Sequence, residues 1–237
     1  MYKLGLMGRD YNDIIVELEG IILGETNNIL SIEEKRGGVH NLPIINDELH
    51  EYFLCGLKKA IVINDISTST RTSFTSNISN EHTIDWLKVS NCNWIHLAYV
   101  DDIPLEALLA CQKQAIPSLS VDFCTLNDRF LYLDILKKCT IIFDSRERKR
   151  LWEKVCLSIP IVLHDPEGCE CLYNGKIIHT ASHRPIDNLK VNGAGDIYAR
   201  YFIDQFTKTG LQQAIKNTCV LTTQKLIELH GVKYEKI

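Results

Sequence analysis

The segment of the sequence best suited to chemistry is Val191–Ala199, which reads VNGAGDIYA. Gly193, Ala194 and Gly195 precede an expected helix, so their backbone N–H groups can point at one spot on the positive end of the helix dipole. Asp196 follows at the helix start, where its carboxylate could take a proton from an attacking hydroxyl while the amides stabilise a transferring phosphoryl group. Taken alone, the same residues could simply form a tight turn whose Asp caps a helix, and by itself the segment favours that interpretation.

From about residue 90, short apolar runs alternate with longer stretches of helical spacing. The short runs indicate strands, and Pro104 suits the first turn of a helix. Such alternation favours an α/β fold with a mainly parallel sheet covered by helices on both faces. We expect strands at 93–97, 117–123, 140–143 and 159–163, and helices at 104–113, 126–138 and 146–156.

The C-terminal part adds a hairpin and a pair of helices. Asn174-Gly175 separates two strand-like runs, at 169–173 and 176–180, and Asn-Gly in that setting is a strong hairpin signal. Residues 193–230 then predict two helices divided near Thr209-Gly210.

The first 80 residues have a different pattern, with little helical spacing. Strand-like runs occur at 14–23 around Gly20, at 60–64 and at 71–76, and helix is expected only around 47–57.

Composition excludes several classes of protein. The chain has 237 residues with 26 Lys and Arg against 30 Asp and Glu, a formal charge of −4, and no clustered basic face for nucleic acid. The nine Cys show no C-x-x-C spacing, which favours buried thiols in a reducing cytoplasm over disulfides or zinc. No signal peptide or membrane span is expected, and a dinucleotide enzyme is disfavoured because no G-x-G-x-x-G follows the first strand.

With its helix behind and its hairpin ahead, Gly-Ala-Gly-Asp resembles the second signature of the PfkB/ribokinase family of carbohydrate kinases. Asp13, after the first strand, resembles the family's substrate-binding Asp, with Gly8 as its early Gly. The run Arg36–Asn41 resembles the Gly-Gly substrate motif, which assigns Gly37, Gly38 and Asn41 to the substrate. Arg71 could reach an anionic substrate, although it equally suits a surface strand.

The resemblance also suggests a nucleotide side. Asp144-Ser145-Arg146-Glu147 resembles the N-x-x-E motif, whose Glu organises magnesium through water. His164, together with Glu167-Gly168, falls where the family lines the nucleotide, and Asn217 falls beside the adenine. A solvated helix face is the competing interpretation for Glu147, as an ordinary helix position is for Asn217.

Several residues depart from the family pattern. His164-Asp165-Pro166 replaces Thr-x-Gly before the nucleotide loop, and Pro removes a backbone donor there. Asp144 replaces Asn, Arg200 stands where small residues are common, and the chain lacks a βα unit expected between Asn41 and Arg71.

The resemblance implies one ribokinase-like domain over 1–237, with lid strands within roughly 13–36 and 60–78. It implies transfer from ATP with Mg²⁺ to a sugar or sugar-like alcohol, and it leaves a monovalent cation open. A nucleoside or vitamin kinase, or a non-catalytic ligand-binding protein that keeps the fold, are the alternatives. The expected partners are small molecules, without nucleic acid or membrane, and a second copy could pair through the lid strands.

Overall fold

The computed structural model describes residues 2–45, 49–67, 70–75, 80–100, 103–113, 119–122, 132–186 and 189–230. Within these ranges the elements follow one another as β1 (Lys3–Leu18), β2 (Ile29–Gly38), η1 (Val39–Asn41), β3 (Leu49–Asp65), β4 (Thr70–Thr75), β5 (Asn80–Glu81), α1 (Trp86–Ser90), β6 (Trp94–Leu97), α2 (Leu105–Lys113), β7 (Leu119–Asp122), α3 (Leu133–Leu136), β8 (Ile141–Ser145), η4 (Arg146–Arg148), α4 (Lys149–Val155), β9 (Ile161–Asp165), β10 (Gly168–Tyr173), β11 (Lys176–Ser182), α5 (Ala194–Thr209) and α6 (Leu211–His230).

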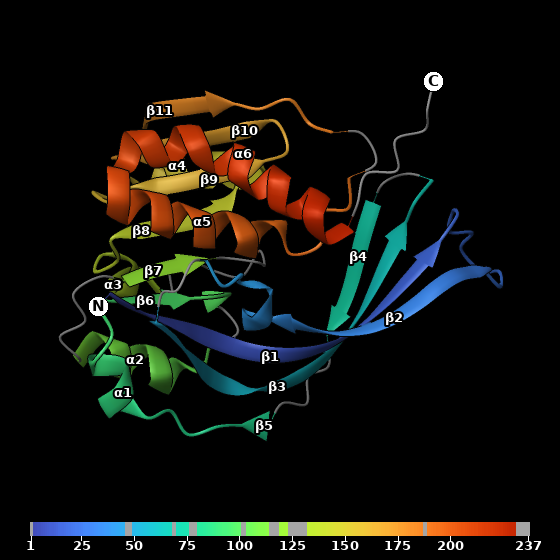
Figure 1. Cartoon of the computed structure of the whole chain (residues 1–237), viewed down its shortest axis with the longest axis horizontal. Helices are drawn as coiled ribbons and strands as arrows, with labels where there is room; N and C mark the ends of the chain where they lie inside the picture. Colours follow the sequence, from blue (N-terminus) through green and yellow to red (C-terminus); the bar gives the residue numbers. More distant parts are fainter. Residues whose placement is uncertain are drawn as a thin grey trace.

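A single large sheet forms the centre of the molecule (Figure 1). Its strand order is β11-β10-β9-β8-β7-β6-β1-β3-β4, with β2 paired to β1 and β5 to β3. The strands β3, β1, β6, β7, β8 and β9 run parallel to one another, and β10 and β11 add an antiparallel hairpin at one edge. The predicted α/β fold with a mainly parallel sheet is confirmed.

Helices cover both faces of this sheet, because side chains alternate along each buried strand. On β8, Ile141 and Phe143 pack in one apolar cluster with α5 and α6. Ile142, between them, packs in a second cluster with α1, α2, α3 and α4. The sheet is therefore the middle of three layers, and the carboxyl ends of its parallel strands share one edge.

The lid is a continuation of two central strands. β1 is 16 residues long, and its second part leaves the body and pairs with β2, from Asp10 opposite Gly38 to Leu18 opposite Ile29. β3 accompanies β1 outward and pairs with β4, so the lid has the order β2-β1-β3-β4. In Figure 1 these strands extend away from the layered body.

Most predicted elements of the C-terminal half are confirmed. The hairpin turns at Asn174 and Gly175, whose φ angles of 50° and 70° are the left-handed values that this turn requires. The last two helices divide at Gly210. The long helix expected over 126–138 is described only as α3, since 123–131 lie outside the described residues.

Two predictions for the N-terminal part were wrong. The helix expected around 47–57 is the first half of β3, because Phe53 and Cys55 on alternate positions pack into the core beside β1. Ile21–Leu23 form an exposed loop and not a strand. Between Asn41 and Arg71 the described residues contain one strand and no helix, as expected for a chain without the βα unit.

Candidate active site

The predicted phosphoryl-transfer loop lies at the start of α5. Gly193 is the N-cap of this helix with φ 78°, a left-handed conformation that glycine adopts without strain. Glycine has no side-chain oxygen to cap the helix, so the first-turn amides of Gly195 and Asp196 remain available to an anion. The amide of Ala194, which we also expected to face the anion, donates to Val191 O at 3.0 Å and helps to form the turn.

Asp196 is buried in the first turn of α5, with 1% of its surface exposed. The hydroxyl of Tyr99, which follows β6, donates a hydrogen bond to Asp196 Oδ2 at 2.5 Å. The carboxylate therefore faces the ends of the central strands, where the loops of an α/β sheet form their ligand sites.

The structure brings two of the predicted substrate residues, Asp13 and Asn41, to this loop. A Cβ built on Gly193 would lie 3.4 Å from Cβ and Cγ of Asn41, so the Asn41 side chain packs directly on the loop. A cleft opens at this contact between the lid and the body. Seven residues line it: Asp13, Ile15, Lys35, Asn41, Val62, Asn192 and Gly193.

The two positions of the Gly-Gly substrate motif require glycine for different steric reasons. A Cβ on Gly37 would lie 2.0 Å from Asp13 Oδ2, so only glycine leaves room for this carboxylate at the cleft. Gly38 has φ 61°, and a Cβ there would lie 2.3 Å from Arg9 O on β1. Gly37 thus shapes the cleft, whereas Gly38 lets the chain turn into η1.

Arg71 lies on β4 opposite Asn64, in the lid. Its side chain is outside the described part of the structure, so its predicted contact with an anionic substrate stays a prediction.

His164, which was predicted to line the nucleotide, packs against the glycine loop at the start of α5. It stacks on Tyr198 with ring centroids 4.4 Å apart, and its Cε1 lies 3.6 Å from where a Cβ on Gly195 would be. Burial lowers the pKa of His164 to about 4, and the nearby carboxylates of Asp144 and Asp165 only partly oppose this effect. The ring is therefore neutral near pH 7 and adds no positive charge to the phosphate site.

Asp144 is committed to the protein itself. Its buried carboxylate accepts hydrogen bonds from Arg148 Nε at 2.6 Å, from Trp152 Nε1 at 2.7 Å and from the Ser145 amide at 2.8 Å. These bonds tie the end of β8 to α4, and a role for Asp144 at a nucleotide stays a prediction.

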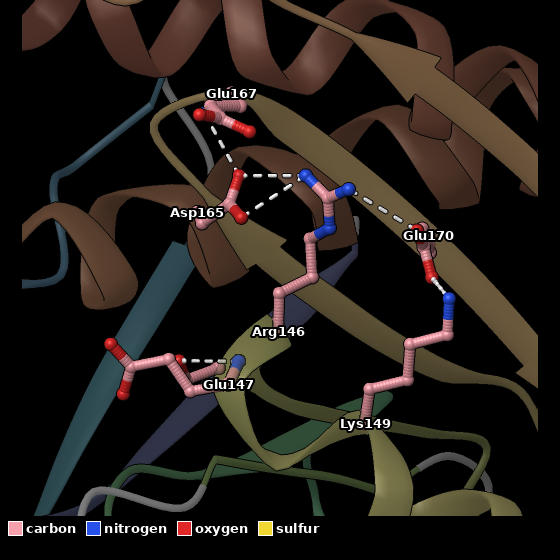
Figure 2. Close-up of polar contacts among 7 residues, drawn as sticks. Arg146, Glu147, Lys149, Asp165, Glu167 and Glu170 are labelled. Carbon is pink, nitrogen blue, oxygen red and sulfur yellow. Dashed lines mark hydrogen bonds and ion pairs between the residues drawn. The ribbon is translucent and has the colours of Figure 1, made fainter.

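An ion cluster occupies the ends of β8 and β9, where the departures from the family pattern lie (Figure 2). Arg146 Nη1 contacts both Asp165 oxygens at 3.0 Å, and its Nη2 contacts Glu170 at 3.2 Å. Lys149 Nζ lies 2.6 Å from the other oxygen of Glu170. Glu147 is exposed, and its carboxylate points away from this cluster in Figure 2.

The remaining predicted nucleotide residues have clear structural roles. The Glu167 amide donates to Asp165 Oδ1 at 2.8 Å, which closes the turn between β9 and β10. A Cβ on Gly168 would lie 2.1 Å from Ala181 O, so the hairpin itself requires glycine here. Asn217 on α6 bonds Gln205 at 3.1 Å and Gln213 at 2.8 Å. The side-chain amide of Asn217 therefore joins α6 to α5, and neither of these two contacts involves the glycine loop at the start of α5.

Four site residues were missed in the sequence: Tyr99, Asp122, Lys35 and Asn192. Asp122 ends β7, is buried, and its Oδ2 would lie 3.8 Å from a Cβ on Gly195. The available signal was a polar residue near the end of an expected strand, because Asp122 is the residue before the last of the strand expected at 117–123 and Tyr99 lies two residues after the strand expected at 93–97. Lys35 and Asn192 adjoin the two glycine motifs, and only the fold brings these motifs together.

Comparison with known proteins identifies the fold. No protein-family model matches the sequence, and no curated protein sequence matches it. Among similar solved structures, a ribokinase of Arabidopsis thaliana complexed with ribose and ATP has 15% sequence identity and a TM-score of 0.66, and the match covers 98% of this chain and 94% of that chain. A nucleoside kinase of Burkholderia thailandensis in complex with inosine has 9% identity and a TM-score of 0.68, with 98% of this chain and 93% of that chain covered. A sulfate complex of a pyrophosphate-dependent kinase in the ribokinase family has 16% identity and a TM-score of 0.67, with 94% of this chain and 95% of that chain covered. The chain therefore has a ribokinase-like fold.

Two further observations concern metals and membranes. Among the described residues, no group of three or more His, Cys, Asp or Glu side chains could hold a metal ion. None of the described helices is both long and apolar enough to cross a membrane.

Proposed function

We propose that the chain is a kinase that transfers a phosphoryl group from ATP to a hydroxyl of a sugar or sugar-like alcohol. One observation carries this proposal: the substrate motifs of the lid and the glycine loop of α5 line a single cleft, where Asn41 packs on Gly193. Asp196 lies three residues after Gly193, in the first turn and at the positive end of this 16-residue helix, and is the base that we propose for the transfer.

The proposed reaction is a direct in-line transfer. Asp196 takes the proton of the acceptor hydroxyl, whose oxygen forms a bond to the γ-phosphorus while the bond from that phosphorus to the ADP oxygen breaks. The amides of Gly195 and Asp196, with that of Gly193, stabilise the negative charge on the transferring group. Ala194 contributes through the turn that aims these amides.

The acceptor would be held by the lid side of the cleft. Asp13 can accept from two substrate hydroxyls, and the Asn41 amide can both donate and accept, which suits a polyol. Ile15 and Val62 add apolar walls for the carbon skeleton of such a molecule. A nucleoside, which presents a ribose, is a second acceptor that the same groups could bind.

The charges of the side chains at the proposed nucleotide site are compatible with ATP and magnesium. Asp144 and Asp165 are paired with Arg148 and Arg146, so these carboxylates exert little repulsion on a triphosphate. Magnesium usually keeps several waters and takes few protein ligands, which suits the exposed carboxylate of Glu147 acting through water. When bound, the ion would offset negative charge on the phosphates.

The second candidate is a ligand-binding protein that keeps the fold without efficient transfer. Pro166 and the Arg146–Asp165 pair favour it, because they replace a loop that would offer a hydroxyl and flexible backbone donors to the phosphates.

A donor and acceptor panel separates the two candidates. We would measure ADP release from ATP and phosphate release from pyrophosphate over sugars, nucleosides and vitamin alcohols. Asp196→Asn, purified identically, controls for contaminating kinases. The proposal expects acceptor-dependent release that the variant lacks. No turnover with any acceptor, together with no calorimetric binding of millimolar ATP, would favour the second candidate.

We further propose that two copies of the chain associate through the lid. The register places Ile14, Ile61 and Phe74 in one row, and Val16, Ile32 and Ile63 in the next, on the face opposite to the cleft. Phe74 and Ile32 are 57% and 62% exposed. An apolar face of this kind is self-complementary when it stacks on its own copy. Sedimentation should show a dimer that Phe74→Glu dissociates, and a monomeric wild type would refute the assembly.

A further inference from the structure

Tyr99 is held rigidly beside the proposed base. It follows β6, and the preceding residue is fixed to the sheet because the Ala98 amide donates to Met7 O at 2.8 Å. After Tyr99, the Ile103 amide donates to Val100 O at 3.2 Å. The phenol is half-buried and lies 2.5 Å from Asp196 Oδ2. The distance and the fixed backbone together place the hydroxyl on this carboxylate.

The backbone of Tyr99 adopts an unfavourable conformation. Its φ is 56°, in the left-handed region that a bulky residue with a Cβ rarely adopts. Glycine or asparagine would fit this backbone with less strain. Strain of this kind is found where the surrounding structure needs a particular side chain at that point. One contact that the Tyr99 side chain makes there is its hydrogen bond to Asp196.

We propose that Tyr99 is a positioning residue, whose phenol sets the orientation of the Asp196 carboxylate toward the acceptor hydroxyl. This inference rests on the proposed kinase function. The phenol donates to Oδ2, which restricts rotation of the carboxylate and stabilises its ionised form. During transfer the acceptor's proton passes to Asp196, and Tyr99 keeps its own proton and remains a donor.

Other charged or titratable groups also lie near Asp196. Asp122 ends β7, His164 is the residue before the last of β9, and Arg200 is buried one turn further along α5. None of these is altered by the substitution Tyr99→Phe, which removes one hydroxyl and keeps the ring. A comparison of the two proteins therefore isolates the phenol.

The first test does not require an active enzyme. Carbon-13 NMR of aspartate-labelled protein, with Asp196 assigned from Asp196→Asn, follows the pH at which this carboxyl takes up its proton. In Tyr99→Phe we expect the midpoint to move to higher pH by about 1 unit, because a hydrogen bond to the ionised form is lost. Tyr173→Phe, at an exposed tyrosine, should leave it unchanged. An unchanged midpoint in a folded Tyr99→Phe protein would overturn the proposal.

The second test separates orientation from charge. With the acceptor found by the panel, kcat of Tyr99→Phe should fall about tenfold at a pH above both midpoints of the NMR titration, while KM for the acceptor changes little. A kcat equal to that of the wild type would refute orientation, and a higher kcat would show that the phenol blocks the base. Should no acceptor be found, the kinase proposal fails while the NMR titration still decides the role of Tyr99.

Discussion

The substitution Gly37→Ala should displace the carboxylate of Asp13 from the cleft without changing Asp13 itself. A Cβ on Gly37 would lie 2.0 Å from Asp13 Oδ2 and 2.6 Å from Asp13 Cγ, well inside contact distance. Either the backbone of β2 or the Asp13 side chain must move. The side chain is the softer of the two, because leaving its rotamer costs about 0.5–1.5 kcal/mol. We therefore expect a folded protein whose Asp13 carboxylate is displaced.

The magnitude follows from the hydrogen bonds that an acceptor would lose. A hydrogen bond to a charged group contributes about 1.5–3 kcal/mol. Losing one such bond corresponds to a rise in KM for the acceptor of about tenfold to hundredfold, since each 1.4 kcal/mol is tenfold. The affinity for ATP should remain, because Gly37 lies on the lid side of the cleft.

The assay is initial-rate kinetics on Gly37→Ala, Asp13→Ala and the double variant. If both changes act through one carboxylate, the double variant should have the KM of Asp13→Ala and no more. Gly24→Ala is the control for an added methyl group without a clash, because a Cβ on Gly24 would meet no atom within 4 Å, although Gly24, unlike Gly37, has a positive φ, of 85°. A wild-type KM for folded Gly37→Ala, or strictly additive effects, would refute the reasoning.

Two further predictions concern stability. Arg148→Met should lower the free energy of unfolding by about 3–5 kcal/mol, because it leaves the buried Asp144 carboxylate without its cation; the exposed Arg150→Met should change it by less than about 0.5 kcal/mol in the same urea titration. The free energy of unfolding should also fall as pH drops from about 6.5 toward 4. Burial lowers the pKa of His164 to about 4 and that of His96 to about 3, so in this pH range the unfolded chain binds more protons than the folded one. Urea titrations at pH 7 and 5 should show this loss, reduced in His96→Asn; equal stability at the two pH values would contradict it.

Sequence reasoning succeeded where one local pattern decides the structure. The alternation of apolar runs predicted the parallel sheet, and Asn174-Gly175 predicted the hairpin, because its turn geometry depends on two adjacent residues. The prediction of a helix over 47–57 was wrong because the apolar positions there fit both the helical and the strand period, and only pairing with β1 selects the strand. Propensity is a weak guide in such a segment.

The site was predicted in part for similar reasons. Glycine motifs mark unusual backbone or close contacts, so Gly37, Gly193 and the nearby Asp196 could be singled out from the sequence. Whether a polar side chain is open to a ligand depends on its neighbours in space. Asp144 was expected at the nucleotide, yet Arg148, four residues later, engages its carboxylate. Tyr99 belongs to no motif, and its hydrogen bond to Asp196 forms only because the fold places the end of β6 next to α5.

The central claim is that the carboxylate of Asp196 acts as the base between two bound ligands. The most direct measurement is the rate of phosphoryl transfer by Asp196→Asn at saturating ATP and acceptor, with the ATP dissociation constant measured by calorimetry on the same preparation. The account predicts a fall in rate of about 10²–10⁴-fold, the usual contribution of a general base, with ATP affinity retained. An unchanged rate in this variant would contradict it.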